Sequence, residues 1–421
     1  MKPIPFLLLL TALSPALAAE PDWPQFRGPK RDDLSPDKGL MKKWPADGPK
    51  LAWKSDDVGQ GFSSVAIQGD TVVTMGDVGK DGAHLVAVSR STGKKLWQCK
   101  VGDGGGGGGY PGPRCTPTID GDLVFGLGQH GDLVAVSMKE GSEVWRANLA
   151  KDYGGQVGGW GYSESVLVDG NNLICTPGGA TATLLCLNKK DGKAVWKGVV
   201  KGGDPAAYSS VVVSNAAGVK QYVTLLGDSL VGFAAKDGSM LWRYGNARNR
   251  FQGNTANIPT TIVKGNQLFA VAGYDRGGAL LTLSGQGGKI NVKEEYWTNQ
   301  LKNKHGGVIQ VGEYLYGDAD DSGKIWCAAL KTGKTAWTRT DDLDAGGSAA
   351  MTHADGLLFV RYQNGWMTLV EANPVKYNLL SSFKVPNGRG NCWAHPVVVG
   401  GKLYLREKET IWCYDVAAGK K

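Results

Sequence analysis

The sequence of 421 residues lacks several features, and each absence excludes a class of protein or of site. After the first 19 residues, no apolar stretch reaches the length of about 18 residues that a membrane-spanning helix needs, so we expect no membrane span. No block of five like charges occurs, and the net charge of +8 predicts a mildly basic surface without a nucleic-acid groove. The absence of Cys-x-x-Cys and Cys-x-x-Cys-His motifs argues against a zinc site and against covalently bound haem, and we predict no metal site.

The first 19 residues have the pattern of a secretory signal peptide. Lys2 supplies a positive end, an apolar run begins at Phe6 and reaches Leu13, and Ala16–Ala19 offers small-residue cleavage sites. The first cysteine is Cys99, so no lipid-modified cysteine is expected near the cleavage site. We therefore predict a protein of the periplasm or of the extracellular space.

What the sequence has in quantity is glycine, with 63 residues, and glycine occupies the tight turns between short strands. The pattern x-Gly-x-x-x-Trp recurs along the chain, and its clear copies end at Trp97, Trp145, Trp196, Trp242 and Trp337. Weaker copies end at Trp53, Trp297 and Phe383, and the eight positions lie 40 to 55 residues apart. That period is typical of one four-stranded propeller blade.

Each repeat contains four short apolar runs separated by turn residues, which predicts strands A to D of a blade. In the first unit we expect these strands at Ser63–Ile67, Thr71–Met75, His84–Ser89 and Lys94–Cys99. Later A strands are expected near residues 115, 163, 209, 258, 306 and 348.

The last unit begins at Trp393 and supplies only three strands, which end with Thr410–Val416. Its missing D strand is predicted at Leu51–Lys54, so that the two ends of the chain close the ring. We therefore predict an all-β, eight-bladed propeller of four-stranded antiparallel blades. The predicted segments are a signal peptide (1–19), an N-terminal lead-in segment (20–49) and the propeller (50–418).

The repeated tryptophans are predicted to fill the wedges between neighbouring blades, because a large aromatic ring buries much apolar surface. We assign this structural docking role to seven of them: Trp53, Trp97, Trp145, Trp196, Trp242, Trp297 and Trp337.

The repeat resembles that of the PQQ-type (quinoprotein) propellers, and residues 87–97, which read AVSRSTGKKLW, are its clearest copy. The resemblance covers nearly all of residues 50–418, and Asp22–Pro29 resembles the lead-in of secreted PQQ-like propellers. Quinoprotein alcohol dehydrogenases share this repeat, as does the scaffolding lipoprotein of the outer-membrane β-barrel assembly machinery. The resemblance therefore implies a fold and leaves the function open.

The seven cysteines do not define a disulfide framework. Cys186, Cys327 and Cys413 each lie six residues before a turn glycine, where other repeats have alanine or glycine, so we interpret them as small core side chains. Two pairs remain open as disulfides, because spacing alone cannot decide whether either forms: Cys175 with Cys186, and Cys99 with Cys115. The pairing of the full set stays open: Cys99, Cys115, Cys175, Cys186, Cys327, Cys392 and Cys413.

The D-to-A connections between successive blades hold most of the unusual residues of the chain. Because these connections gather around the axis at one face of a propeller, we predict a ligand-binding funnel there. Its residues are Arg114, Trp160, Tyr162, Glu164, Tyr208, Asn257, His305, Trp393 and His395. A structural interpretation stays open beside this one, with Arg114 and Glu164 as an ion pair and His395 bonded only to backbone.

Three functions remain possible, and we favour a non-enzymatic scaffold that binds a protein, a small molecule or a carbohydrate through the funnel. The first alternative is a PQQ- and Ca²⁺-dependent oxidoreductase of alcohols or sugars, with Glu164 and Asn257 as possible calcium ligands. The sequence has no Cys-Cys pair of the kind found in that family, so no cofactor is firmly implied. The second alternative is a polysaccharide lyase or hydrolase. We expect a monomer, because a closed ring needs no partner to complete its core.

Overall fold

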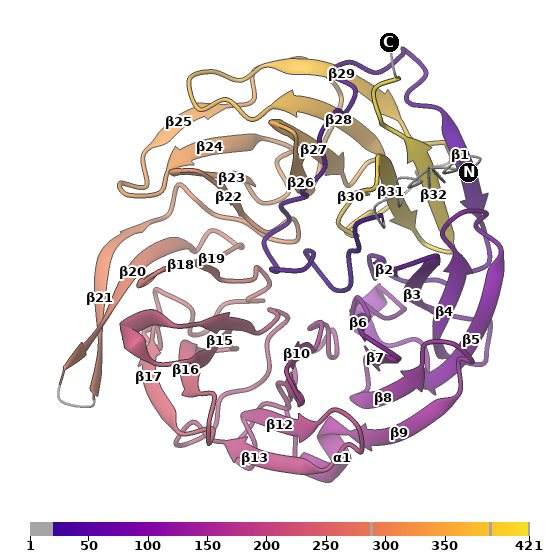
Figure 1. Cartoon of the computed structure of the whole chain (residues 1–421). Helices are drawn as coiled ribbons and strands as arrows, with labels where there is room; N and C mark the ends of the chain where they lie inside the picture. The colour runs from indigo at the N-terminus through magenta and orange to yellow at the C-terminus, as the bar shows by residue number, and fades with distance from the viewer. Residues whose placement is uncertain (1–19, 287–288, 387–389, 420–421) are drawn as a thin grey trace, which may run out of the picture.

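The computed structural model describes residues 20–286, 289–386 and 390–419. These residues form eight four-stranded antiparallel sheets, which are arranged as blades around a central axis (Figure 1). The predicted eight-bladed propeller is therefore confirmed. The predicted signal peptide lies outside the described residues.

The first four blades follow one another along the chain, and each is a sheet of four consecutive strands. Blade 1 contains β2 (Ala66–Gln68), β3 (Thr71–Asp77), β4 (Ala83–Ser89) and β5 (Lys95–Gly102). Blade 2 contains β6 (Thr118–Asp120), β7 (Leu123–Leu127), β8 (Asp132–Ser137) and β9 (Glu143–Asn148). Blade 3 contains β10 (Leu167–Asp169), β11 (Asn172–Cys175), β12 (Leu184–Asn188) and β13 (Ala194–Gly198). Blade 4 contains β14 (Val212–Ser214), β15 (Gln221–Leu225), β16 (Leu230–Ala234) and β17 (Met240–Tyr244).

The next three blades repeat this order, and the eighth closes the ring. Blade 5 contains β18 (Ile262–Lys264), β19 (Gln267–Ala272), β20 (Gly277–Gln286) and β21 (Lys289–Thr298). Blade 6 contains β22 (Ile309–Val311), β23 (Tyr314–Asp318), β24 (Ile325–Ala329) and β25 (Thr335–Thr338). Blade 7 contains β26 (Ala349–Ala354), β27 (Leu357–Tyr362), β28 (Trp366–Glu371) and β29 (Leu379–Lys384). Blade 8 contains β30 (Val397–Val399), β31 (Lys402–Glu407), β32 (Thr410–Asp415) and the N-terminal β1 (Leu51–Ser55).

In the described residues, helical structure is confined to three short segments. The helix α1 (Leu149–Tyr153) and the 3₁₀ turn η1 (Gly107–Gly109) follow blades 2 and 1, and η2 (Ala216–Gly218) lies within blade 4. The ring closes as predicted, because β1 pairs antiparallel with β32 and places Lys54 opposite Trp412.

Most A strands begin three or four residues later than predicted, with Ala66 in place of Ser63 in blade 1, whereas β26 begins one residue later. Before the A strands of blades 1 to 3, side chains of the neighbouring blade accept the backbone N–H groups in place of a strand partner. The N–H of Ser64 donates to Oγ1 of Thr116 (3.0 Å), and the N–H of Thr116 donates to Oγ of Ser165 (2.9 Å).

Four docking tryptophans contact the turn glycine of the next blade: Trp53, Trp97, Trp145 and Trp196. Trp97 packs on Gly141 (φ +68°), where an added Cβ would lie 2.7 Å from the indole, and its Nε1 donates to the carbonyl of Met138 (2.9 Å). Trp53, Trp145 and Trp337 also donate Nε1–H to a carbonyl oxygen of the next blade. The glycine of the repeat is needed for its positive φ and for this close approach.

The docking contacts differ in blades 4 and 5. Trp242 is buried in a cluster that joins these two blades, as predicted, but it donates Nε1–H to Gln221 of its own blade (2.6 Å). In blade 5, Tyr296 takes the docking place, because its ring packs on Gly333 and its hydroxyl donates to the carbonyl of Leu330 (2.7 Å). Since adjacent residues of a strand point to opposite faces, Trp297 faces the connection between blades 4 and 5 and packs against Phe251.

A small residue on strand C lies opposite the tryptophan of strand D. The pairs include Ala87 with Trp97, Ala135 with Trp145, Cys186 with Trp196, Cys327 with Trp337 and Cys413 with Trp53. The three cysteines are fully buried, as the interpretation as small core side chains requires.

All seven thiols are free, so neither open disulfide pair is formed. In blade 3, Cys175 lies opposite Leu185, and Cys186 lies opposite Ile174. The two side chains therefore point to opposite faces of the sheet, which prevents a bond between them.

The N-terminal segment enters the ring, an arrangement that its sequence did not predict. Residues 22–35, which we call the plug, run through the centre of the propeller (indigo in Figure 1). Trp23 forms a bridge with Ile67 of blade 1, and Leu34 forms one with His353 of blade 7. Between them, Nη1 of Arg31 donates to the carbonyls of Ser165 (3.0 Å) and Val211 (2.9 Å). The plug thus links blades on opposite sides of the ring.

Candidate functional site

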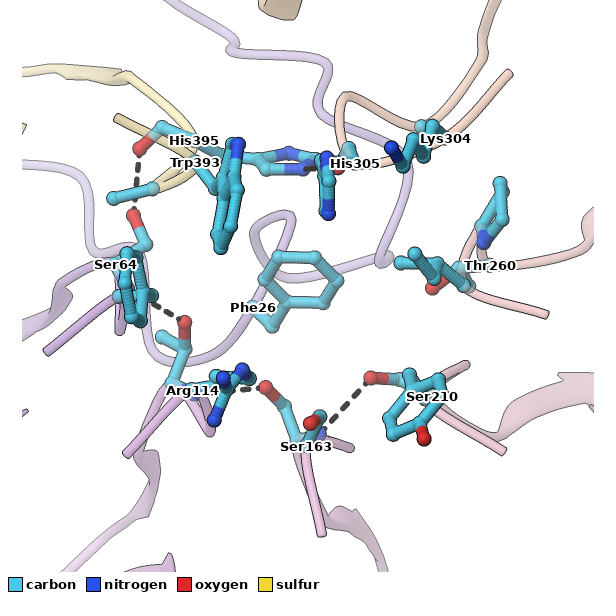
Figure 2. Close-up of a pocket in the computed structure, with 18 of the residues that line it drawn as sticks. Phe26, Ser64, Arg114, Ser163, Ser210, Thr260, Lys304, His305, Trp393 and His395 are labelled. Carbon is cyan, nitrogen blue, oxygen red and sulfur yellow. Dashed lines mark hydrogen bonds between the residues drawn. The ribbon is translucent and has the colours of Figure 1, made fainter. Parts of the chain in front are cut away.

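A cavity of about 230 Å³ lies above the plug, where the D-to-A connections meet. Apart from Phe26 and Arg27 of the plug and Tyr274 of the β19–β20 connection, all of its lining residues belong to D-to-A connections. Figure 2 shows Phe26 at the centre of the ring that these residues form. The plug therefore forms the floor of the cavity, and the connections form its wall.

The lower wall is a ring of equivalent positions, each two residues before an A strand. Five of them carry hydroxyl groups, and the sixth and eighth blades supply Gly307 and His395. The hydroxyl residues are Ser64, Thr116, Ser165, Ser210 and Thr260. Each of Thr116, Ser165 and Ser210 accepts a backbone N–H from the neighbouring blade through its side-chain oxygen.

The upper wall is aromatic and is organised around Trp393. One face of Trp393 stacks on His305, with ring centroids 4.2 Å apart and an interplanar angle of 14°. Phe62 stacks on Trp393 as well, at 4.8 Å. Across the cavity, Trp160 and Tyr208 form an edge-to-face pair at 5.9 Å. Rings from blades far apart in the sequence thus converge on one space, as in many small-molecule sites.

Six of the nine predicted funnel residues line this cavity: Arg114, Trp160, Tyr208, His305, Trp393 and His395. The structure therefore brings them together, and ligand binding by them stays a prediction. Phe26 and Arg27 were missed, because nothing in the sequence of the lead-in segment shows that it enters the channel.

The other three predicted residues are buried beside the cavity and make structural contacts. The hydroxyl of Tyr162 donates to the carbonyl of Pro177 (2.8 Å). Glu164 accepts hydrogen bonds from the backbone N–H and from the hydroxyl of Thr176. Asn257 donates to the carbonyls of Leu226 (2.8 Å) and Gly227 (2.9 Å). Their polar groups are used within the protein.

The suggested ion pair between Arg114 and Glu164 is not among the contacts of the described residues. Arg114 instead donates to the carbonyls of Gly112 (3.2 Å) and Tyr110 (2.8 Å) of its own connection. Burial raises the pKa of Glu164 to about 7, and its hydrogen bonds with Thr176 and the charge of Arg31 oppose this shift.

His305 has a defined tautomer, because Ser348 fixes it. The hydroxyl of Ser348 donates to Oδ1 of Asp321 (2.6 Å), so its oxygen accepts from Nδ1 of His305 (3.1 Å). Burial, together with the charge of Lys304, lowers the pKa of His305 to about 3. The imidazole is therefore neutral near pH 7, and its Nε2 is a hydrogen-bond acceptor.

His395 contacts a side chain as well as the backbone, so the structural interpretation with backbone bonds alone is wrong. Its Nδ1 lies 3.1 Å from Oδ2 of Asp33 in the plug. The same oxygen lies 3.1 Å from Nε of Arg27. The Nε2 of His395 lies 3.3 Å from the carbonyl oxygen of His305. This buried cluster joins the plug to two connections of the cavity wall.

The residues present do not fit a calcium-bound quinone. Calcium takes six to eight oxygen ligands, usually with carboxylates among them, but the cavity lining contains no Asp or Glu. The polar groups of Glu164 and Asn257, the predicted calcium ligands, are engaged elsewhere. In the described part of the chain, no group of three or more His, Cys, Asp or Glu side chains is placed to hold a metal ion.

These features define the class of protein: an eight-bladed propeller whose D-to-A connections surround one cavity at the axis. A family profile described as outer membrane protein assembly factor BamB matches residues 36–158 and 81–339. The chain therefore belongs to this family of PQQ-like repeat propellers, as the repeat predicted.

Two curated proteins are similar in sequence. Tetrathionate hydrolase of Acidithiobacillus ferrooxidans is 26% identical over 335 residues, which cover 76% of this chain and 53% of that protein. Outer membrane protein assembly factor BamB of Shewanella oneidensis is 25% identical over 272 residues, which cover 58% of this chain and 60% of that protein. The matches thus span between about half and three fifths of these relatives.

Solved structures with the same fold include BamB from Moraxella catarrhalis, with a TM-score of 0.59, 14% identity and coverage of 87% of this chain and 99% of that one. Quinohemoprotein alcohol dehydrogenase from Comamonas testosteroni has a TM-score of 0.65, 13% identity and coverage of 96% and 82%. At these identities the likeness shows the fold alone. None of the helices in the described residues has the length and apolar character needed to cross a bilayer.

Proposed function

We propose that this propeller is a non-enzymatic binding protein that holds a small molecule in the cavity between the D-to-A connections. The observation that carries the proposal is the convergence of aromatic rings from several connections above a floor closed by Phe26. A concave, largely aromatic space with a few polar groups is the usual form of a small-molecule site. We also propose that the protein acts in the periplasm or outside the cell, as the pattern of residues 1–19 predicts.

The neutral fluorescent probe N-phenyl-1-naphthylamine tests the proposal, because its emission rises in an aromatic, dry site. We expect one saturable site per chain. Trp160→Ala removes one wall of the cavity and should weaken probe binding about ten-fold, as for other losses of a buried aromatic contact. The melting temperature should change little, since Trp160 lies in a surface connection.

Leu96→Ala is the matched control, because Leu96 is 51% exposed on an outer strand, away from the cavity. It should leave probe binding unchanged. A folded Trp160→Ala variant that binds the probe as well as the unmodified protein would contradict the proposal.

The two enzymatic alternatives differ in how well the cavity suits them. The calcium-dependent oxidoreductase is disfavoured, because the lining has no carboxylate. A polysaccharide lyase or hydrolase stays a prediction, and Tyr208, His305 and Arg114 do line the cavity. Incubation with a glycan mixture, followed by chromatography of the products, tests that alternative directly.

A further inference from the structure

The charged side chains that line the cavity are all positive. Its lining contains Arg27, Arg114 and Lys304, and it contains no Asp or Glu. Lys304 is neutralised by Asp321 behind the wall (2.5 Å), and Nε of Arg27 lies 3.1 Å from Asp33 below the floor. Arg114 therefore decides the charge that a bound molecule meets at the wall.

Arg114 forms no ion pair with any residue that the structure describes. In the described residues its guanidinium donates only to carbonyl oxygens, those of Gly107, Gly112 and Tyr110. It lies 5.3 Å from the ring centre of Phe62. It is half-buried, and burial lowers its pKa. A desolvated cation without a carboxylate partner is destabilised, and an anion beside it would relieve that cost.

At the floor, the guanidinium of Arg27 is paired with Asp33, but it still offers one unused hydrogen-bond donor. Its Nη1 is buried and has no hydrogen-bond partner among the described residues. It lies against Gly307, where an added Cβ would be 2.5 Å from Nη1. Gly307 occupies the ring position that carries a hydroxyl in blades 1 to 5, so the missing side chain makes room for this cation.

The hydroxyl residues of the lower wall, which we call the hydroxyl ring, supply hydrogen-bond donors that also favour a negatively charged group. The side-chain oxygens of Thr116, Ser165 and Ser210 each accept a backbone N–H. In the described residues, their hydroxyl protons have no acceptor, so they are available to a ligand oxygen. The charge of Arg114, the unused Nη1 donor of Arg27 and these hydroxyl donors all favour negative charge in the cavity. The aromatic wall favours an apolar body.

We infer that the ligand is a small organic anion, with its carboxylate, sulfonate or phosphate group toward Arg114 and the hydroxyl ring and its planar or apolar body between Trp160, Tyr208 and Trp393. This inference rests on the proposed function and names the chemical class of its ligand. It requires no metal ion, because the positive charge comes from the protein itself.

Two probes that share one skeleton test the inference on the full chain. 8-Anilino-1-naphthalenesulfonate carries a sulfonate, and N-phenyl-1-naphthylamine is the same molecule without it. We expect the sulfonate probe to bind at least about ten-fold more tightly than the neutral probe at low salt, as for a charge-assisted hydrogen bond. Arg114→Gln should remove most of this preference, whereas binding of the neutral probe should change less than about two-fold.

Two variants control for the effects of charge and of folding. Arg114→Lys keeps the charge and should retain most of the preference for the sulfonate. Lys139→Gln removes one charge from a side chain that is 91% exposed on the outer surface, and it should change neither constant.

Each outcome has one meaning. If the neutral probe binds and the sulfonate adds no affinity, the anion inference is wrong and the proposed function stands. If neither probe binds the folded protein, both are wrong. If Arg114→Gln weakens both probes equally, Arg114 only holds its connection in place, and its assignment to the anion is wrong. If sulfate at micromolar concentration and constant ionic strength displaces the sulfonate probe, the site holds an inorganic anion. The inference that the ligand has an apolar body is then wrong.

Discussion

The imidazole Nδ1 of His395 lies 3.1 Å from Oδ2 of Asp33, although 362 residues separate them in the chain. Asp33 belongs to the plug and His395 to the connection before the last blade, and both side chains are buried. Because the same carboxylate also lies 3.1 Å from Nε of Arg27, it holds the floor of the cavity against its wall. The site therefore depends on a segment that is not part of any blade.

Asp33→Asn is expected to destabilise the protein by about 3 kcal/mol, because it leaves the buried charge of Arg27 without a carboxylate. The backbone of Asp33 has φ +56°, a conformation that asparagine tolerates, so the change isolates the charge. Chemical unfolding followed by tryptophan fluorescence measures the loss. Asp56→Asn is the control, since Asp56 is 59% exposed in its pair with Lys54, and it should change little. Equal stability of the two variants would contradict the prediction.

Glu164→Gln is expected to remove a pH dependence of stability. Burial raises the pKa of Glu164 from 4.5 to about 7 in the folded state, so between these values the unfolded chain is ionised while the folded protein stays protonated. The unmodified protein therefore loses up to about 3 kcal/mol of stability as the pH rises through this range. Unfolding curves from pH 4 to pH 8 measure the difference.

The Glu164→Gln variant should be flatter over that range, with its advantage over the unmodified protein complete above pH 7. Glu313→Gln, at a side chain that is 74% exposed, serves as the control and should keep the original profile. If stability changed with pH in the same way for the unmodified protein and for Glu164→Gln, burial would not raise the pKa of this carboxyl.

Ala135→Leu is expected to cost about 1–3 kcal/mol, because the larger side chain would meet Trp145 on the neighbouring strand. Cys186→Ala keeps a small residue opposite Trp196 and should cost about 1 kcal/mol or less. Thermal melts of the two variants compare these costs. If Cys186→Ala were the more damaging change, the cysteine would have a role beyond its size.

Calcium is expected to have no effect on the binding of pyrroloquinoline quinone, because the cavity lining offers no carboxylate. Titration of the quinone with and without Ca²⁺, followed by quenching of tryptophan fluorescence, measures this directly. A cooperative thermal melt of the same sample shows that the protein is folded. Saturable, calcium-dependent quenching at micromolar quinone would restore the oxidoreductase alternative.

Repetition is the property that the sequence by itself determined. The spacing of Trp97, Trp145 and the other docking residues specifies the number of blades, and the orphan strand around Trp53 specifies how the ring closes. Both are local signals, because a blade is built from consecutive strands and its turn glycine lies a few residues from its tryptophan. That the D-to-A connections meet around one space could be predicted for the same reason.

Only the tertiary structure decided which residues of those connections face the cavity. Trp160 and Glu164 lie in one connection, yet the first lines the cavity and the second is buried behind it, because the direction of a loop side chain follows from packing between blades. The plug has no repeat and no strand pattern, so Phe26 and Arg27 gave no local signal. Their place at the floor depends on contacts of Asp33 and Arg31 with blades more than a hundred residues away.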